Sequence, residues 1–140
     1  MKKIIILFVI FTISHSSLIV ASEKANQKEE SMQSEQTPAV LWKIVSLENW
    51  NASQNKKTLV LSSDDDAFIH LSKDNQYPKV LEKYWPGKEC VLLLVKTSEL
   101  IGRLVFEPNR PGGESYYHLY EGSIPLTAIT QASFVKATHL

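Results

Sequence analysis

The sequence predicts one small domain of the α+β class. Two observations lead to this prediction. Helical spacing of apolar residues is confined to the first half of the folded region, and short runs rich in β-branched and aromatic residues crowd the second half. Such segregation favours α+β over a regular βαβ alternation. The chain has 140 residues, 44% of them hydrophobic, which suffices for one core and hardly for two.

The N-terminal segment has the composition of a secretory signal peptide. Lys2 and Lys3 precede an apolar run over residues 4–13, and small residues follow around Ala21. We expect removal of residues 1–21, so that the protein is secreted or periplasmic and keeps no stable membrane span. The alternative is an uncleaved anchor, in which the apolar residues 18–21 extend the first run.

Residues 22–38 are predicted to be a disordered linker, because their polar and charged side chains cannot bury enough apolar surface to offset the entropy of ordering. The folded domain is expected over residues 39–140. The chain carries 15 basic and 15 acidic residues, so it lacks the positive charge typical of a dedicated nucleic-acid binder. We therefore expect no nucleic-acid partner.

The domain is predicted to open with a strand and a helix. Residues 40–45 form a short apolar run with β-branched and aromatic members, which is typical of a strand. Ser46 can cap a following helix, in which Leu47 and Trp50 would share one face. The run at residues 58–61 is too short to assign.

A second strand and a second helix are predicted after a loop at residues 62–66. Residues 68–71 form the strand, and Ser72 is expected to cap the helix. Pro78 would sit in the second turn, so this helix either starts later or kinks. The pair Pro86-Gly87 ends it. Its core-facing stripe is expected to comprise Tyr77, Val80, Leu81, Tyr84 and Trp85.

The second half of the domain is predicted to be rich in strands. Residues 90–96 form a continuous apolar run, which indicates a strand buried on both faces, with Cys90 as a small buried hydrophobe at its start. Pro108 ends a later strand. We expect a helical turn at residues 98–101, strands at 104–107, 115–120 and 128–135, and a loop at 109–113.

Ionisable side chains occupy four positions in or beside the predicted strands. They are Lys43, His70, Glu107 and His118. Such groups lose hydration unless they face water, a partner or a ligand. Strand alternation offers one explanation, in which each side chain points to solvent or to a hydrogen-bonding neighbour. A shared polar cleft is the other, and the sequence leaves both open.

Several site types lack their sequence signatures. The histidines are widely spaced, with neither an HxH nor an HExxH pair, so no metal site is expected. A nucleophile elbow of the form Gly-x-Ser-x-Gly is missing. The run Asp64-Asp65-Asp66 lacks the spacing of an EF-hand loop, and we interpret it as a solvated turn.

Four short segments in order resemble a known family. They are Leu-Trp-Lys-Ile at residues 41–44, Ala-Phe-Ile-His-Leu-Ser at 67–72 with Gln76 four residues later, Val-Phe-Glu at 105–107, and His-Leu-Tyr at 118–120. In this combination the chain resembles the family known as domain of unknown function 952 over about residues 40–136.

The resemblance implies a fold similar to that of the ADP-ribosyltransferases, with a split antiparallel or mixed sheet around a nucleotide cleft. It implies that Lys43 is a ligand contact on the first strand and that Glu107 is the candidate catalytic carboxylate. His70 and His118 would be further catalytic residues. The implied ligand-binding residues are Lys43, Ser72, Gln76 and Tyr120.

These expectations leave three functions open. The first is a polar cleft that binds a small, nucleotide-like or phosphorylated ligand. The second is an ADP-ribosyl or phosphoryl transferase in which Glu107 acts as an electrostatic or general-base group. The third is a non-catalytic protein-interaction domain. A shared fold does not by itself select among them, and no cofactor follows from the sequence.

Overall fold

The structure is a computed structural model that describes residues 36–136. The expected signal peptide at residues 1–21 and the expected linker up to residue 35 lie outside the described residues, as do residues 137–140. Residues 36–39 have no regular structure, and the first strand begins at Val40. Within this part of the chain, no helix is long and apolar enough to cross a membrane.

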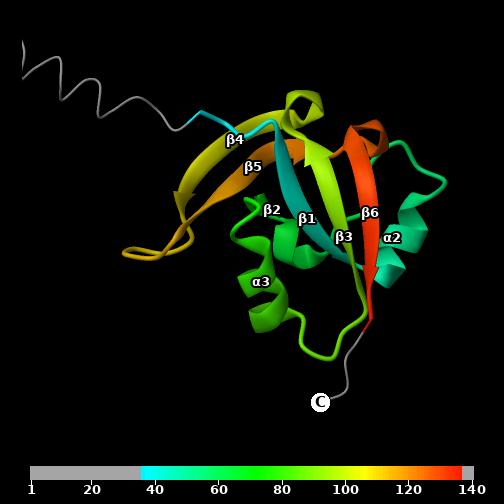
Figure 1. The fold of residues 1–140 in the computed structure, drawn as a ribbon. Helices are drawn as coiled ribbons and strands as arrows, with labels where there is room; N and C mark the ends of the chain where they lie inside the picture. Colours follow the sequence, from blue (N-terminus) through cyan, green and yellow to red (C-terminus); the bar gives the residue numbers. More distant parts are fainter. Residues whose placement is uncertain (1–35, 137–140) are drawn as a thin grey trace, which may run out of the picture. The chain divides into compact units, whose positions relative to one another are not determined.

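Two three-stranded antiparallel sheets form the domain (Figure 1). The first has the order β1-β3-β6 and the second the order β2-β5-β4. The α+β prediction is therefore confirmed, with every described strand pair antiparallel. The strands are β1 (Val40–Ser46), β2 (Ile69–Leu71), β3 (Cys90–Lys96), β4 (Ile101–Pro108), β5 (Ser115–Ser123) and β6 (Ile129–Val135).

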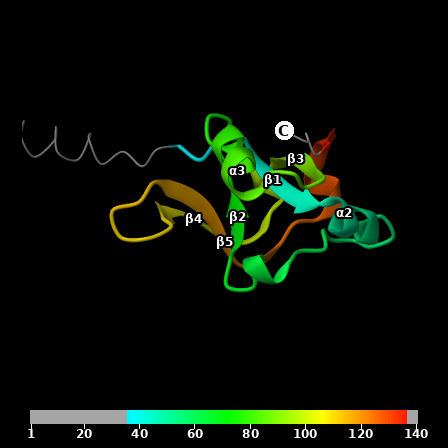
Figure 2. The same ribbon diagram turned by 90° about the horizontal axis from the view of Figure 1, so that it is seen from below.

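The two predicted helices are α2 (Leu47–Ser53) and α3 (Tyr77–Tyr84), and three short 3-10 turns accompany them. Ser46 caps α2 as expected, because its side chain accepts a hydrogen bond from the main-chain N–H of Asn49 at 3.1 Å. The tip of the β4–β5 hairpin and helix α2 lie at opposite ends of the domain (Figures 1 and 2). The 3-10 turns are η1 (Ser63–Asp65), η2 (Thr97–Glu99) and η3 (Leu126–Ala128).

Ser72 does not cap the second helix, which starts later, one of the two alternatives that Pro78 left open. Gln76 is the residue that precedes α3, and Pro78 lies in the first turn, where its missing N–H leaves no hydrogen bond unmade. Ser72 instead pairs with Trp42 through two main-chain hydrogen bonds of 2.8 and 2.9 Å. These bonds join the edge of the first sheet to the second, and this long-range pairing is why Ser72 is not a cap.

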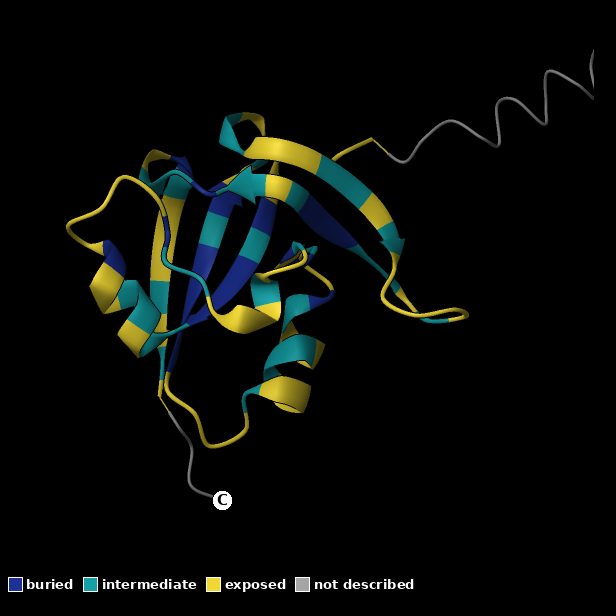
Figure 3. Ribbon diagram, turned by 180° about the vertical axis from the view of Figure 1, so that it is seen from behind, coloured by how far each residue is buried: buried dark blue, intermediate teal, exposed yellow. Residues whose placement is uncertain are grey.

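The main hydrophobic core is shared by the two sheets. The first sheet contributes one face of β1 and of β3, and the second contributes β2 and β5. A smaller core lies where α3 packs against Ile44, Cys90 and Leu92. Strand β3 is thus covered on both faces, as predicted, and most of its length is buried (dark blue in Figure 3). Cys90 is a buried free thiol. Alternation along the strands then decides which polar side chains face away from the main core.

Candidate functional site

A polar face lies on the side of the second sheet opposite the main core. Tyr117 and Leu119 of β5 point into the core, so alternation turns His118 to the other face. His118 pairs with His70 of β2 in the sheet register, and their ring centroids are 5.5 Å apart. The structure therefore brings together the two histidines that the sequence separates by 47 intervening residues.

His118 is almost fully buried and uses both of its ring nitrogens. Nδ1 lies 2.9 Å from Oε1 of Glu107, and Nε2 lies 2.7 Å from Oδ1 of Asn109. Each ring nitrogen therefore already has a hydrogen-bond partner within the protein. The ring of Phe68 stacks on His118 with centroids 4.0 Å apart and covers it.

Glu107 is held by a second donor, the hydroxyl of Tyr120. The hydrogen bond from Tyr120 and then that from His118 lower the pKa of Glu107 below its usual value. The same contact raises the pKa of Tyr120. Arg103 lies over the Tyr120 ring, 4.8 Å from its centroid. Glu107 is therefore an ionised carboxylate that is held by hydrogen bonds from a phenol and an imidazole.

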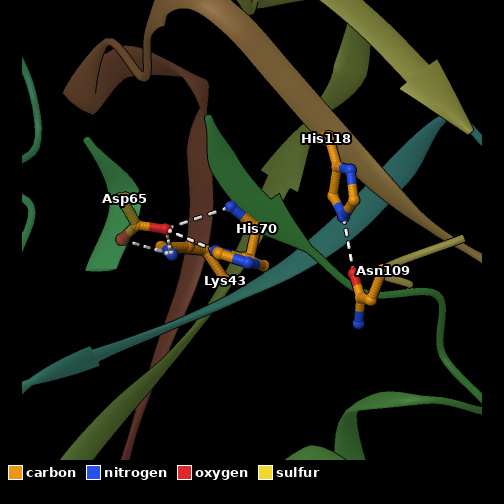
Figure 4. Close-up of polar contacts among 5 residues, drawn as sticks. All are labelled: Lys43, Asp65, His70, Asn109 and His118. Carbon is orange, nitrogen blue, oxygen red and sulfur yellow. Dashed lines mark hydrogen bonds and ion pairs between the residues drawn. The ribbon is translucent and has the colours of Figure 1, made fainter. Parts of the chain in front are cut away.

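A second polar network joins the first sheet to the second (Figure 4). The Nζ atom of Lys43 lies 2.8 Å from both carboxylate oxygens of Asp65. Oδ1 of Asp65 also accepts from the main-chain N–H of His70 at 3.0 Å and lies 3.1 Å from its Nδ1. The side chains of Lys43 and Asp65 are only 5% and 6% exposed, whereas that of His70 is 46% exposed.

Burial and ion pairing have opposite effects on the pKa values of Lys43 and Asp65. Burial lowers the pKa of Lys43, and the charge and hydrogen bonds of Asp65 oppose that change. Burial alone would raise the pKa of Asp65, but its hydrogen bond with His70 and the charge of Lys43 outweigh this effect, and its pKa lies below the usual value. Asp65 is thus an ionised carboxylate with little contact with solvent.

A groove of about 900 Å³ passes along this network. It is bounded by β1, by the segment from η1 to β2, by α3 and by the β4–β5 loop. Of the predicted site residues, Lys43, His70 and Ser72 line it. Its aromatic lining comprises Trp42, Phe68, Tyr84, Trp85 and Tyr116, and its exposed cationic side chains are Lys79, Lys83, Lys88 and Arg110.

The sequence pattern of the family described as "Protein of unknown function (DUF952)" matches residues 44–132. The chain belongs to this family. Comparison with curated proteins gives no match. Among solved structures, the crystal structure of protein CC0527 from Caulobacter crescentus is similar, with a TM-score of 0.58 and 28% identity over 68% of this chain and 84% of that one. The solution structure of CC0527 gives a TM-score of 0.57 at 28% identity, over 69% of this chain and 84% of that one.

The remaining predicted residues of this DUF952 domain lie outside the groove lining. Gln76 is buried, accepts from the main-chain N–H of Lys73 and donates to Glu114 and to the carbonyl of Ser115. It therefore fastens the start of α3 to the β4–β5 hairpin. The group formed by Glu107, His118 and Tyr120 lies behind Phe68, on the polar face of the second sheet.

Sequence reasoning missed two residues of these polar networks, Asp65 and Asn109. The interpretation of residues 64–66 as a solvated turn was wrong for Asp65, whose carboxylate is buried against Lys43. A lysine in the middle of an apolar strand was the available signal, because a buried ammonium requires an acidic partner. Asn109, the partner of His118, carried only the signature of a turn residue. Across residues 36–136, no three His, Cys, Asp or Glu side chains converge as a metal site requires.

Proposed function

We propose that the groove binds a small anionic ligand that carries a planar ring, such as a nucleotide or another phosphorylated compound. The observation that carries this proposal is the meeting of four exposed cationic side chains and five aromatic rings in one groove. Ammonium and guanidinium groups form strong hydrogen bonds with phosphate oxygens. Aromatic rings stack on planar heterocycles.

The charge balance of the groove supports an anionic ligand. Lys43 and Asp65 neutralise each other. The other acidic side chains of the lining are Asp64 and Glu114, against the four cations. Lys83 already lies over the ring of Tyr84, with 5.1 Å between its Nζ and the ring centroid. The groove is therefore locally cationic although the whole chain is neutral.

A more specific alternative to ligand binding is an ADP-ribosyl or phosphoryl transferase with an ADP-ribosyltransferase-like fold. Two antiparallel sheets beside a polar groove are consistent with it. Glu107 is ionised, as such chemistry needs, but it does not line the groove. Ligand binding is therefore the function that the geometry supports best, and a catalytic role for Glu107 is the second candidate.

Addition of ADP-ribose to the purified protein is expected to raise its melting temperature. A ligand at one hundred times its dissociation constant stabilises the folded state by about 2.7 kcal/mol. Lys83→Ala and Arg110→Ala should each weaken the response, because each removes a cation of the groove. Thermal-shift titrations with ADP-ribose, ATP and inorganic phosphate measure this.

Lys56→Ala is the matched control, because Lys56 is exposed and does not line the groove. Its titration should equal that of the wild type. A melting temperature unmoved by all three probes contradicts the proposed function. The protein-interaction alternative would then be favoured, with the exposed Ile101 and Phe134 as its first candidates for a contact surface.

We also propose that residues 1–21 direct export and are then removed, which places the domain in the periplasm or outside the cell. The basic start, short apolar run and small residues at the cut support this. Expression of the full chain in an export-competent bacterium is expected to yield a product that begins at Ser22 or Glu23. Mass spectrometry of the periplasmic fraction and medium measures this. Recovery of an intact Met1 chain in the membrane fraction would instead support the uncleaved anchor.

A further inference from the structure

We propose that His70 is a general acid–base residue of the groove, positioned by Asp65 and Lys43, and that it promotes hydrolysis of a phosphoester or glycosidic bond in the bound ligand. This inference rests on the proposed ligand-binding function. It assigns the chemistry to His70 rather than to Glu107 and gives Asp65 and Lys43 the role of positioning residues.

The contacts of Asp65 orient the imidazole of His70. Oδ1 of Asp65 accepts from the main-chain N–H of His70 and lies 3.1 Å from Nδ1, so one oxygen holds both the main chain and the ring. A carboxylate at this distance keeps the hydrogen of a neutral imidazole on Nδ1. Nε2 then carries the lone pair, which is the atom that takes a proton in general-base catalysis.

The three residues in contact, Lys43, Asp65 and His70, differ sharply in solvent exposure. The side chains of Lys43 and Asp65 are 5% and 6% exposed, while the ring they support is 46% exposed and lines the groove. A buried ion pair adds little stability relative to apolar residues of similar size. Its position directly beneath an exposed imidazole is therefore better explained by orientation of that ring than by stability of the core.

Unlike His70, His118 has neither a free ring nitrogen nor an exposed ring. Both of its nitrogens are occupied, by Glu107 and Asn109, and it is 1% exposed beneath Phe68. It has no nitrogen left to exchange a proton with a ligand. Its network instead packs beside the ring of His70, at 5.5 Å between centroids, and supports the wall from which that ring projects.

The proposed step balances with water as the only co-reactant. Nε2 of His70 takes a proton from a water molecule as the water oxygen forms a bond to phosphorus or to the anomeric carbon. The bond from that atom to the leaving group breaks, and its electron pair stays on the leaving oxygen or nitrogen. When the leaving atom is an oxygen, the proton passes from Nε2 to it. When it is the pyridinium nitrogen of NAD, nicotinamide leaves as a neutral ring, and the proton passes from Nε2 to water. The exposed cations of the groove stabilise the negative charge that develops on a phosphoryl group.

Nitrogen-15 NMR of the wild-type protein tests the orientation without any substrate. We expect neutral His70 to carry its hydrogen on Nδ1. In Asp65→Asn this preference should weaken, while Lys56→Ala should leave it unchanged. A neutral His70 with its hydrogen on Nε2 in the wild type would overturn the proposal, whether or not the Asp65 variant folds.

Turnover tests the chemistry. Bis-p-nitrophenyl phosphate probes a phosphodiester, and NAD probes both a pyrophosphate and a glycosidic bond. We expect His70→Ala to lower kcat by about 10²–10⁴-fold for the probe that is cleaved. A wild type that is stabilised by ADP-ribose but cleaves neither probe overturns the catalytic inference and leaves the proposed binding function standing. Equal turnover by His70→Ala and the wild type also overturns it.

Discussion

Replacement of Asp65 with alanine is expected to lower the free energy of unfolding by about 3–5 kcal/mol. The substitution leaves the ammonium of Lys43 buried without a counter-charge, and it removes the acceptor of the His70 main-chain N–H. Burial already lowers the pKa of Lys43, so loss of the ion-pair partner of its Nζ forces Lys43 to lose its proton or to reach water. Urea denaturation monitored by tryptophan fluorescence measures the change.

Asp64→Ala is the matched control, because Asp64 is the exposed neighbour of Asp65. It should change the free energy of unfolding by no more than about 0.5 kcal/mol. The double variant Lys43→Met with Asp65→Asn should recover much of the loss, since no buried charge remains. Equal effects of Asp65→Ala and Asp64→Ala would show that the ion pair does not form.

The pair also predicts a direction for the pH dependence of stability. The pKa of Asp65 is lower in the folded state, so its contribution is present above the pKa of the unfolded chain, about 3.9. It is lost as pH falls through the lower pKa of the folded state. The acid-side decline of the urea midpoint should therefore be shallower in Asp65→Asn than in the wild type.

Gly122→Ala is expected to destabilise the protein by about 3 kcal/mol or more. Gly122 lies at a β-bulge, where one extra residue of β5 opposes Gly102 of β4 and Glu121 adopts a φ of 48°. A methyl group at Gly122 would clash with the main-chain oxygen of Ile101. A main-chain oxygen in a strand cannot move aside cheaply, so the bulge must rearrange. Thermal and urea denaturation measure the loss.

Gly112→Ala separates this clash from simple backbone strain. Gly112 has a φ of 72°, but a methyl group there would meet nothing within 4 Å. Its replacement should cost about 1–2 kcal/mol, the penalty of the left-handed conformation alone. A Gly122→Ala variant as stable as Gly112→Ala would contradict the close approach of β4 and β5 at the bulge.

Local patterns in the sequence predicted most of the secondary structure. The continuous apolar run at residues 90–96 is strand β3, and the cap at Ser46 begins α2. The failures occurred where a distant partner outweighed local preference. Ser72 has the side chain of a helix cap, but its main chain pairs with Trp42, which lies 30 residues earlier.

The residues of the candidate site likewise fall into those that local sequence patterns revealed and those that they did not. His70, Glu107 and His118 were recognisable from sequence because ionisable side chains in apolar strands need a hydrogen-bonding partner. The structure confirms only that they lie together, through the register of β2, β4 and β5. Asp65 was hidden in an acidic run that resembles a solvated turn, and only the position of Lys43 beneath that turn distinguishes it from its neighbours.

Local periodicity and short motifs were enough to predict the α+β class, the family and the set of unusual polar positions. The pairing of these polar groups with one another depends instead on how the two sheets pack. Asp65 reaches both Lys43 and His70, and Asn109 reaches His118, across contacts that sequence spacing does not encode. A buried charge is stabilised by whichever partner the packing of the two sheets brings within about 3 Å, and that partner can lie anywhere in the sequence.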